Sequence, residues 1–374
     1  MKVMVLAGGP DRERAVSLRS GAQVAAALRV AGHDVRERDM GPEDLAALEE
    51  FARWTADGPD QPDAPGNGTT HRASDDGEIE GGNEGGDEGG RGGGVVFPVF
   101  HGKWGEGGGC QALLEAAGVA FVGCGSEAAR RCFDKAQTKR LLEARGLPTP
   151  AWELVAVTDR PTLEPPVVIK PVDEGSSIDL RLCPDAASLG AAWSELAGSG
   201  RHGALLVERL IRGRELTVGV VVGEGNAAAD AATASALNEP RDEAGNEGGT
   251  EGGGGGVGAL PVIRIVPATE FYDYQAKYER DDTRYEFDAV DPAIEAQLRH
   301  LATQVFTELG CRHLARVDLF LDADDRPWVI EVNTLPGFTD HSLMPRAARH
   351  AGLAMPALVD RLVRAAAAEH LANR

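Results

Sequence analysis

The chain has 374 residues, 42% of them hydrophobic and 26% charged, which is enough for two or three domains of ordinary size. Its formal charge of −21, from 59 acidic and 38 basic residues, argues against sequence-independent nucleic-acid binding, which needs a cationic face. No apolar run reaches the roughly 18–20 residues of a membrane span, so we expect no membrane association.

The first part of the chain alternates between strand and helix patterns. Val3–Ala7 is a buried apolar run that predicts a first strand, not a signal peptide. The following elements are predicted as a helix over Ser17–Val30, strands at His33–Val35 and Val95–Phe100, a helix near 110–117 and a strand at Val119–Val122. This order predicts a parallel, doubly wound domain. The five cysteines are an odd number without a CxxC pair, which indicates a reduced, cytoplasmic location.

Two segments differ sharply from the rest in composition. Residues 57–94 contain 13 glycines, ten acidic and two basic residues, and residues 223–258 contain 11 glycines, seven acidic residues and one basic residue. Together they carry 14 of the 21 excess negative charges (8 + 6). Such segments cannot bury enough apolar surface to offset chain entropy, so we expect two disordered insertions. They are interpreted as solvated loop expansions, with an acidic interaction or metal-sequestering tail as the alternative.

After Leu147–Pro150 the predicted strands come closer together. They are Val167–Lys170, Ile178–Leu182, Leu205–Glu208, Glu215–Val222, Pro261–Pro267, Arg316–Leu321 and Trp328–Val332. Helices are predicted near 186–197, 292–309 and 356–368. This pattern predicts α+β structure, with antiparallel sheets covered by helices on one face.

Two glycine-containing loops are candidate anion sites. Gly8–Arg14 lies between a strand and a helix, where backbone amides favour an anion, but it lacks the dinucleotide fingerprint. Lys170 ends a buried strand and is followed by Glu174-Gly175-Ser176-Ser177. A lysine beside a small Gly-Ser-Ser loop suits a phosphate chain, although an ordinary turn with a surface lysine has the same pattern.

A predicted hairpin near the end of the chain carries an oxygen-ligand set. The two-residue period places Arg316 and Asp318 on one strand face, and Glu331 and Asn333 share a face of the next strand. Residues 322–326 form the turn between them. Two carboxylates and an amide oxygen on one sheet suit Mg²⁺ held together with nucleotide phosphates, whereas the alternative is a solvated polar sheet face.

One aromatic and charged run is a candidate lid. Phe271–Tyr278 contains three of the four tyrosines and is followed by further charged residues. A lid over a reaction site is one interpretation, and a surface loop with locally packed rings is the other.

In chain order these motifs resemble those of the D-alanine–D-alanine ligase family of the ATP-grasp superfamily. The resemblance runs from Val3 to about Leu362. It rests on Glu13–Ser17, His101-Gly102, Asp134-Lys135, Lys170-Pro171, Glu174–Ser177, Val207-Glu208, Phe271–Tyr278, Arg316–Asp318, Glu331–Thr334, Pro336-Gly337 and His341–Leu343. The resemblance implies an ATP-grasp fold of three domains, with ATP between the central and C-terminal antiparallel sheets. The expected boundaries are 1–125, 126–210 and 211–374.

The resemblance also implies a reaction and its residues. One D-alanine carboxylate would take the γ-phosphate of ATP, and the amine of a second D-alanine would displace phosphate from the acyl phosphate, for peptidoglycan synthesis. The catalytic and substrate-binding residues would be Glu13, Ser176, Tyr278, Arg316, Gly337, His101, Ser342 and Leu343. The nucleotide would contact Lys135, Lys170, Glu208, Ile211, Glu215 and Lys277. Two Mg²⁺ ions, or Mn²⁺, would be held by Asp318, Glu331 and Asn333. The family implies a cytoplasmic homodimer whose small-molecule partners are ATP and D-alanine.

Some positions depart from the family pattern. Ala15 replaces a second acidic residue, and Lys103-Trp104 replaces a common Arg-Gly after the His-Gly pair. A bulky Trp104 near the first-substrate site keeps a ligase of different dipeptide or depsipeptide specificity as an alternative. A non-catalytic ATP-binding regulator is a further alternative, although it predicts decay of the phosphate and metal residues, all of which are present.

Overall fold

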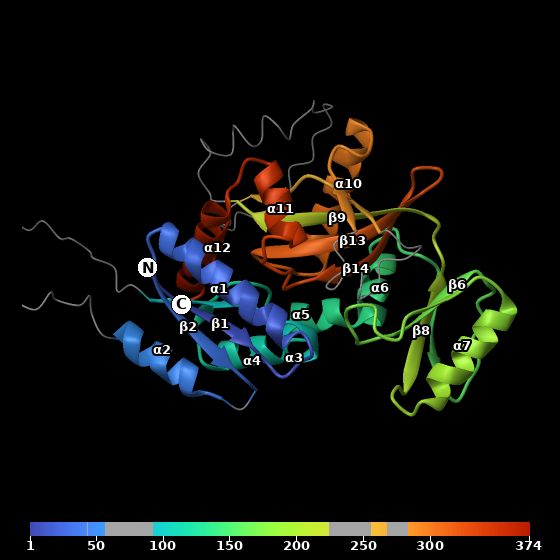
Figure 1. Ribbon diagram of the computed structural model, residues 1–374, viewed down its shortest axis with the longest axis horizontal. Helices are drawn as coiled ribbons and strands as arrows, with labels where there is room; N and C mark the ends of the chain where they lie inside the picture. The colour runs from blue at the N-terminus through green and yellow to red at the C-terminus, as the bar shows by residue number, and fades with distance from the viewer. Residues whose placement is uncertain (43, 57–92, 224–255, 268–282) are drawn as a thin grey trace, which may run out of the picture.

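The computed structural model describes residues 1–42, 44–56, 93–223, 256–267 and 283–374 (Figure 1). Most of the two predicted insertions, and the whole of the predicted lid at 271–278, lie outside these residues. Within the described part of the chain, no helix is both long and apolar enough to cross a membrane.

The first sheet is parallel and has strand order β2-β1-β3-β4, which confirms the predicted doubly wound arrangement. The strands are β1 (Lys2–Gly8), β2 (Asp34–Met40), β3 (Val95–Pro98) and β4 (Ala120–Phe121). One face packs against α1 (Arg14–Val30) and α12 (Met355–Ala372). The other face packs against α2 (Ala46–Ala56) and α4 (Gly109–Ala116), and α3 (Gly102–Glu106) precedes α4. The C-terminal helix therefore completes the N-terminal layer (Figure 1).

Two helices, α5 (Ser126–Phe133) and α6 (Lys135–Ala144), lead into a second sheet. Its strands are β5 (Trp152–Ala156), β6 (Val167–Pro171), β7 (Arg181–Cys183) and β8 (Ala204–Arg209). They pair antiparallel in the order β5-β8-β6-β7, and α7 (Ala186–Gly198) packs on them.

The third sheet is also antiparallel, with order β12-β11-β9-β13-β14 and β10 paired to β9. Its strands are β9 (Gly213–Val222), β10 (Val257–Ala259), β11 (Ile263–Val266), β12 (Arg284–Glu286), β13 (Leu314–Asp322) and β14 (Pro327–Asn333). α10 (Pro292–Glu308) covers one face, and α11 (Leu343–His350) follows β14 in the chain.

Two sequence expectations need correction. The strand predicted at 178–182 is β7 at Arg181–Cys183, because Ser176, Ser177 and Asp179 have φ values of 53°, 57° and 55°, which no extended strand accepts. The insertion predicted at 223–258 ends too late, because Val257–Ala259 is paired with β9.

Candidate active site

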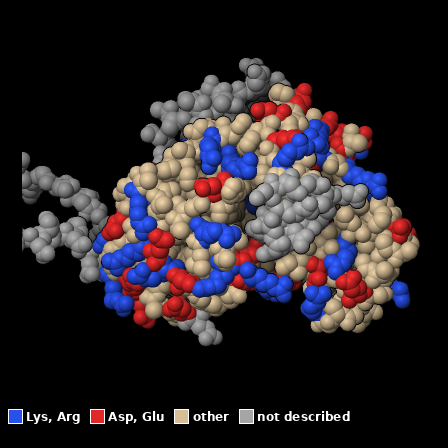
Figure 2. Space-filling view, in the orientation of Figure 1, with Lys and Arg blue, Asp and Glu red and all other residues tan. Residues whose placement is uncertain are grey.

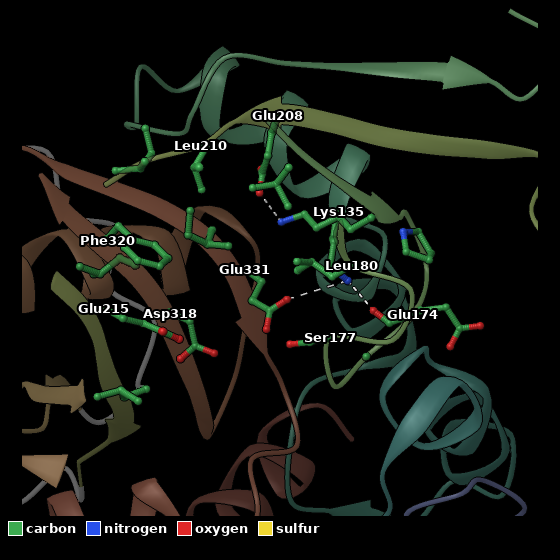
Figure 3. A pocket seen from close by; sticks show the side chains of 18 of the residues that line it. Lys135, Glu174, Ser177, Leu180, Glu208, Leu210, Glu215, Asp318, Phe320 and Glu331 are labelled. Carbon is green, nitrogen blue, oxygen red and sulfur yellow. Dashed lines mark hydrogen bonds and ion pairs between the residues drawn. The ribbon is translucent and has the colours of Figure 1, made fainter. Parts of the chain in front are cut away.

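A pocket opens between the second and third sheets. Its apolar wall is made by Val168, Ile178, Leu180, Leu210, Ile211, Ile265, Leu319, Phe320, Ile330 and Leu343. Its charged residues are Lys135, Lys170, Glu174, Glu208, Arg209, Glu215, Arg316, Asp318 and Glu331. Figure 3 shows Glu208 at one end, Glu331 in the middle and Asp318 beside Glu215 at the other end. A cleft that combines apolar walls with lysines and carboxylates suits a ligand such as a nucleotide, which has a flat apolar part and a charged part.

Glu208 is shared by two buried lysines at one end of the pocket. Lys170 Nζ donates to Glu208 Oε1 at 2.5 Å, and Lys139 Nζ lies 2.7 Å from Oε2. Lys139, which is 0% exposed, also donates to Thr149 Oγ1 at 2.8 Å. Burial alone would raise the pKa of Glu208, but the two ammonium groups outweigh it and the pKa is lowered. Glu208 is therefore held as an anion inside the protein.

Lys139 was not identified from the sequence. It lies four residues after Lys135 in α6, so both lysines project from the same helix face. A pair of lysines at this spacing on a helix whose face is buried was the available signal. Burial lowers the pKa of Lys139, although Glu208 opposes that shift.

Lys135 stands at the start of α6, where Asp134 caps the helix by accepting from the Gln137 amide at 3.0 Å. Its Nζ donates to the Glu174 carbonyl at 2.5 Å and lies 3.9 Å from Glu331 Oε2 (Figure 3). Burial is the main cause that lowers the pKa of Lys135. The lysine therefore joins the loop after β6 to the carboxylate on β14.

The β13–β14 hairpin brings together the predicted metal residues. Asp318 is paired in register with Glu331, and Arg316 with Asn333. The Arg316 guanidinium holds Asp318 with two hydrogen bonds of 2.9 and 2.8 Å, and Thr217 Oγ1 donates to the same carboxylate at 2.6 Å. Thr217, on β9, is a supporting contact that was not predicted.

The polar residues of this hairpin suit Mg²⁺ only when a bound ligand supplies further oxygen atoms. Within the residues described, no three His, Cys, Asp or Glu side chains are grouped to hold a metal. Asp318 and Glu331 supply two carboxylates, and Asn333 Oδ1 already accepts from the Leu335 amide at 2.9 Å. Mg²⁺ commonly takes one or two protein carboxylates and completes its shell with phosphate oxygens and water.

A second group of predicted residues lies between the first sheet and the loop after β6. Ser176 Oγ donates to Glu13 Oε1 at 2.8 Å, across 163 residues of sequence. His101 is buried; its Nδ1 lies 3.4 Å from Glu106 Oε1, and its Nε2 has no hydrogen-bond partner. A buried imidazole nitrogen normally has a hydrogen-bond partner, so Nε2 of His101 can donate a hydrogen bond to a bound molecule or accept one from it.

Gly337 and Ser342 adjoin this group. A Cβ on Gly337 would lie 2.8 Å from Ser342 Oγ and 3.9 Å from His101 Cε1, so the position admits only glycine without displacement. Ser342 Oγ also bonds the Thr339 amide and hydroxyl, at 3.0 and 2.9 Å. Leu343, the next residue, reaches the pocket wall.

The remaining sequence expectations divide in two. Lys277 and Tyr278, with the rest of the predicted lid, lie outside the described residues. Trp104 packs edge-on against Phe100 at 4.7 Å and approaches Gly9 and Gly109, and Ala15 is exposed. Neither of these two side chains lines the nucleotide pocket, but Trp104 lies against the loop that contains Glu13.

Comparison with known proteins covers almost all of the chain. The family model described as D-ala D-ala ligase N-terminus matches residues 2–124, and D-ala D-ala ligase C-terminus matches 141–239 and 252–364. A D-alanine–D-alanine ligase B from Chromobacterium violaceum is 35% identical over 359 residues, covering 94% of this chain and 93% of its own. A D-alanine–D-alanine ligase from Cupriavidus necator is 36% identical over 371 residues, covering 98% and 91%.

Solved structures show the same fold. Two structures of a D-alanine–D-alanine ligase from Bacillus anthracis align with all of both chains, at TM-scores of 0.69 and 0.70 and identities of 21% and 23%. The first of them is complexed with ATP. This likeness confirms the predicted combination of one parallel and two antiparallel sheets.

Proposed function

The chain belongs to the D-alanine–D-alanine ligase family, and from that premise we propose how its residues divide the work. The enzyme joins two D-alanine molecules with the use of ATP and supplies D-alanyl-D-alanine for peptidoglycan synthesis. The observation that supports the division is the placement of Lys135 between the Glu174 loop and Glu331, beside the Glu13–Ser176 contact.

The nucleotide occupies the pocket between the second and third sheets. Glu208 and Ile211 lie along the adenine and Glu215 reaches the ribose, since all three line the pocket. Lys135 and Lys170 hold the phosphates, and Lys277 approaches the γ-phosphate. Phosphoryl transfer depends mainly on positioning and on neutralising charge, which the two buried lysines supply without a covalent nucleophile.

Asp318, Glu331 and Asn333 would hold two Mg²⁺ ions, or Mn²⁺ in their place, together with the nucleotide. When bound, such ions would supply charge neutralisation for the phosphates of the nucleotide. Asp318 is kept in place for this task by Arg316 and Thr217.

Glu13 binds the ammonium of the first D-alanine, with His101 nearby and Ser176 and Tyr278 hydrogen-bonding around it. The carboxylate of that D-alanine attacks the γ-phosphorus, so that ADP leaves and an acyl phosphate forms. The second D-alanine, held at its carboxylate by Ser342 and Leu343, then attacks the acyl carbon with its free amine. Arg316 and the Gly337 amide stabilise the tetrahedral oxyanion, and phosphate departs as the peptide bond forms.

The decisive test is product analysis with purified enzyme, Mg-ATP and D-alanine, in parallel with L-alanine and with D-alanine plus D-lactate. We expect D-alanyl-D-alanine as the dominant product, with ADP released in equal amount. ADP release with a different dipeptide or a depsipeptide would show another specificity, and no turnover in any mixture would favour a regulator.

The metal assignment is tested by Glu331→Gln. We expect almost complete loss of turnover and weaker Mn²⁺ binding to the enzyme–nucleotide complex, followed by electron paramagnetic resonance. The matched control is Glu49→Gln on the exposed face of α2, which should leave both unchanged. Near-normal turnover in Glu331→Gln would contradict the assignment.

The cellular location and the oligomeric state that we propose are those that the family resemblance implies. A cytoplasmic homodimer is the proposal, and light scattering of the eluting enzyme measures its mass.

A further inference from the structure

Two side-chain contacts connect the N-terminal part of the molecule to the loop that follows β6. One is the Ser176–Glu13 hydrogen bond described above. The other joins Lys103, on α3, to Asp173, with Nζ 2.5 Å from Oδ2. The function proposed above does not use Lys103.

The loop needs external support because its backbone is unfavourable. Ser176 and Ser177 have left-handed φ values of 53° and 57°, a conformation that non-glycine residues keep only when their surroundings enforce it. The Lys135 amide donates to the Val172 carbonyl at 3.0 Å, and Lys135 Nζ holds the Glu174 carbonyl. Asp173 lies between these two anchored carbonyls, so a contact at Asp173 restrains the segment that leads to Ser176.

The backbone around Lys103 is fixed by hydrogen bonds and by packing. Asp11 accepts hydrogen bonds from the backbone amides of Lys103 and Trp104, and Trp104 packs edge-on against Phe100. The first turn of α3 is therefore tied to the loop that contains Glu13. Because α3 is fixed relative to this loop, a lysine on α3 can hold Asp173 in a defined position relative to Glu13.

We propose that Lys103 and Asp173 are positioning residues, whose ion pair holds the 173–177 loop against the N-terminal part so that Ser176 stays bonded to Glu13. The proposal rests on the function assigned above to Glu13, binding of the first D-alanine. The pair does not touch the nucleotide pocket, since neither residue lines it. Because the loop that the pair holds also supplies Glu174, Gly175 and Ser177 to that pocket, loss of the pair raises KM for the first D-alanine more than KM for ATP, and it leaves the thermal midpoint near its wild-type value.

The expected size is modest because the pair is exposed, at 68% for Lys103 and 41% for Asp173. Exposed pairs support changes of about twofold to fivefold in an equilibrium. Salt screens such pairs, so the KM of the wild-type enzyme for the first D-alanine should rise with ionic strength.

The test compares Lys103→Met, Asp173→Asn and the swapped double variant Lys103→Glu/Asp173→Lys. We expect each single variant to raise KM for the first D-alanine about twofold to fivefold and to remove the dependence of this KM on salt. The swapped variant should bring KM back toward the wild-type value and restore most of its salt dependence. The matched control is Arg145→Met, which breaks an exposed pair with Glu308 of 2.9 Å elsewhere and should change neither KM. Unchanged KM in the single variants, or a swap no better than they are, would overturn the proposal.

A readout independent of activity separates this proposal from the proposed function. Hydrogen exchange of the 173–177 amides in the full chain should be faster in Lys103→Met than in the wild-type enzyme and in Arg145→Met. Equal exchange in all three overturns the positioning role, whichever product the enzyme makes. A different product combined with faster exchange in Lys103→Met supports the contact and rejects only the substrate assignment.

Discussion

Glu208 shows how one side chain can determine the electrostatics of a whole site. Two lysines approach its two oxygens, and all three groups are buried, with exposures of 3% for Glu208, 4% for Lys170 and 0% for Lys139. Taking three charges out of water is costly, and the arrangement is tolerable only while the carboxylate remains between the ammonium groups. The stability of the cluster therefore depends more on Glu208 than on Lys139.

Replacing Glu208 should cost more stability than replacing Lys139. Glu208→Gln leaves two buried lysines without their counter-ion, for which we expect a loss of about 3–5 kcal/mol in the free energy of unfolding. Lys139→Met leaves Glu208 paired with Lys170, so we expect roughly 1–2 kcal/mol from the lost contacts with Glu208 and Thr149. Urea unfolding at neutral pH measures both, and equal losses would contradict this account.

Residue-scale prediction from the sequence succeeded where chemistry and spacing coincide. The period of two placed Asp318 and Glu331 on adjacent strands, and the structure pairs them directly. Thr217 was not predicted because it acts through Asp318 and belongs to no motif, and the one signal for Lys139 was its four-residue spacing from Lys135. Contacts between distant segments, such as Lys103 with Asp173, have no local signal at all.

At the scale of elements, most strands and helices could be predicted because their apolar periodicity is strong. α2 was missed although Leu48, Phe51 and Trp54 are spaced three apart and all buried. α11 was not predicted, although its Pro345 lies in the first turn, where the absent amide is not needed. The misplaced β7 reflects left-handed serines that propensity does not anticipate.

The packing of α1 on β1 depends on a small residue. A Cβ on Gly21 would lie 2.7 Å from Ala7 Cβ, which can move only with its strand. In α7, by contrast, no heavy atom comes within 4 Å of a Cβ added to Gly190. Both glycines sit inside helices, where alanine is intrinsically favoured by about 1 kcal/mol.

These two glycines should therefore respond oppositely to alanine. Gly21→Ala should lower the free energy of unfolding by about 1–2 kcal/mol, because overpacking exceeds the gain in helix propensity. Gly190→Ala should raise it by about 0.5–1 kcal/mol. Chemical denaturation measures both values, and a stabilising Gly21→Ala would show that α1 shifts without cost.

At the scale of the whole molecule, α12 ties the end of the described chain to its beginning. Leu358, Val359, Leu362 and Val363 are fully buried in the same core as Val3, Val5 and Val24. Polar contacts fix its position, including His33 Nε2 with Asp360 at 2.7 Å and His313 Nε2 with Glu369 at 2.7 Å. Basic and acidic side chains are interspersed over the described part of the face in Figure 2.

The Glu369 contact predicts a pH dependence. The hydrogen bond from His313, opposed by partial burial and aided by Arg312, lowers the pKa of Glu369 from 4.5 to about 2. A lowered pKa contributes stability that is complete above pH 4.5 and is lost as the pH falls toward about 2. Because the Glu369 carboxylate is partly exposed and therefore screened by solvent, we expect this contact to contribute about 1 kcal/mol to the free energy of unfolding.

The comparison of Glu369→Gln with the wild-type protein isolates this contribution. The variant should be less stable by about 1 kcal/mol at pH 6, and the difference should shrink as the pH falls below 4.5. Glu127→Gln, at an exposed pair with Arg131 on α5, is the control and should show no such trend. A constant difference at all pH values would contradict the assigned pKa.

The position of α12 has a consequence for the order of synthesis. The strands of the first sheet, ending with β4, leave the ribosome long before residues 355–372 are made. Until then the face of β3 and β4 that α12 covers has no partner from that helix, and its apolar side chains stay available to other apolar surfaces. The nascent chain must therefore keep its first-made sheet soluble and unfinished while the two antiparallel sheets are translated.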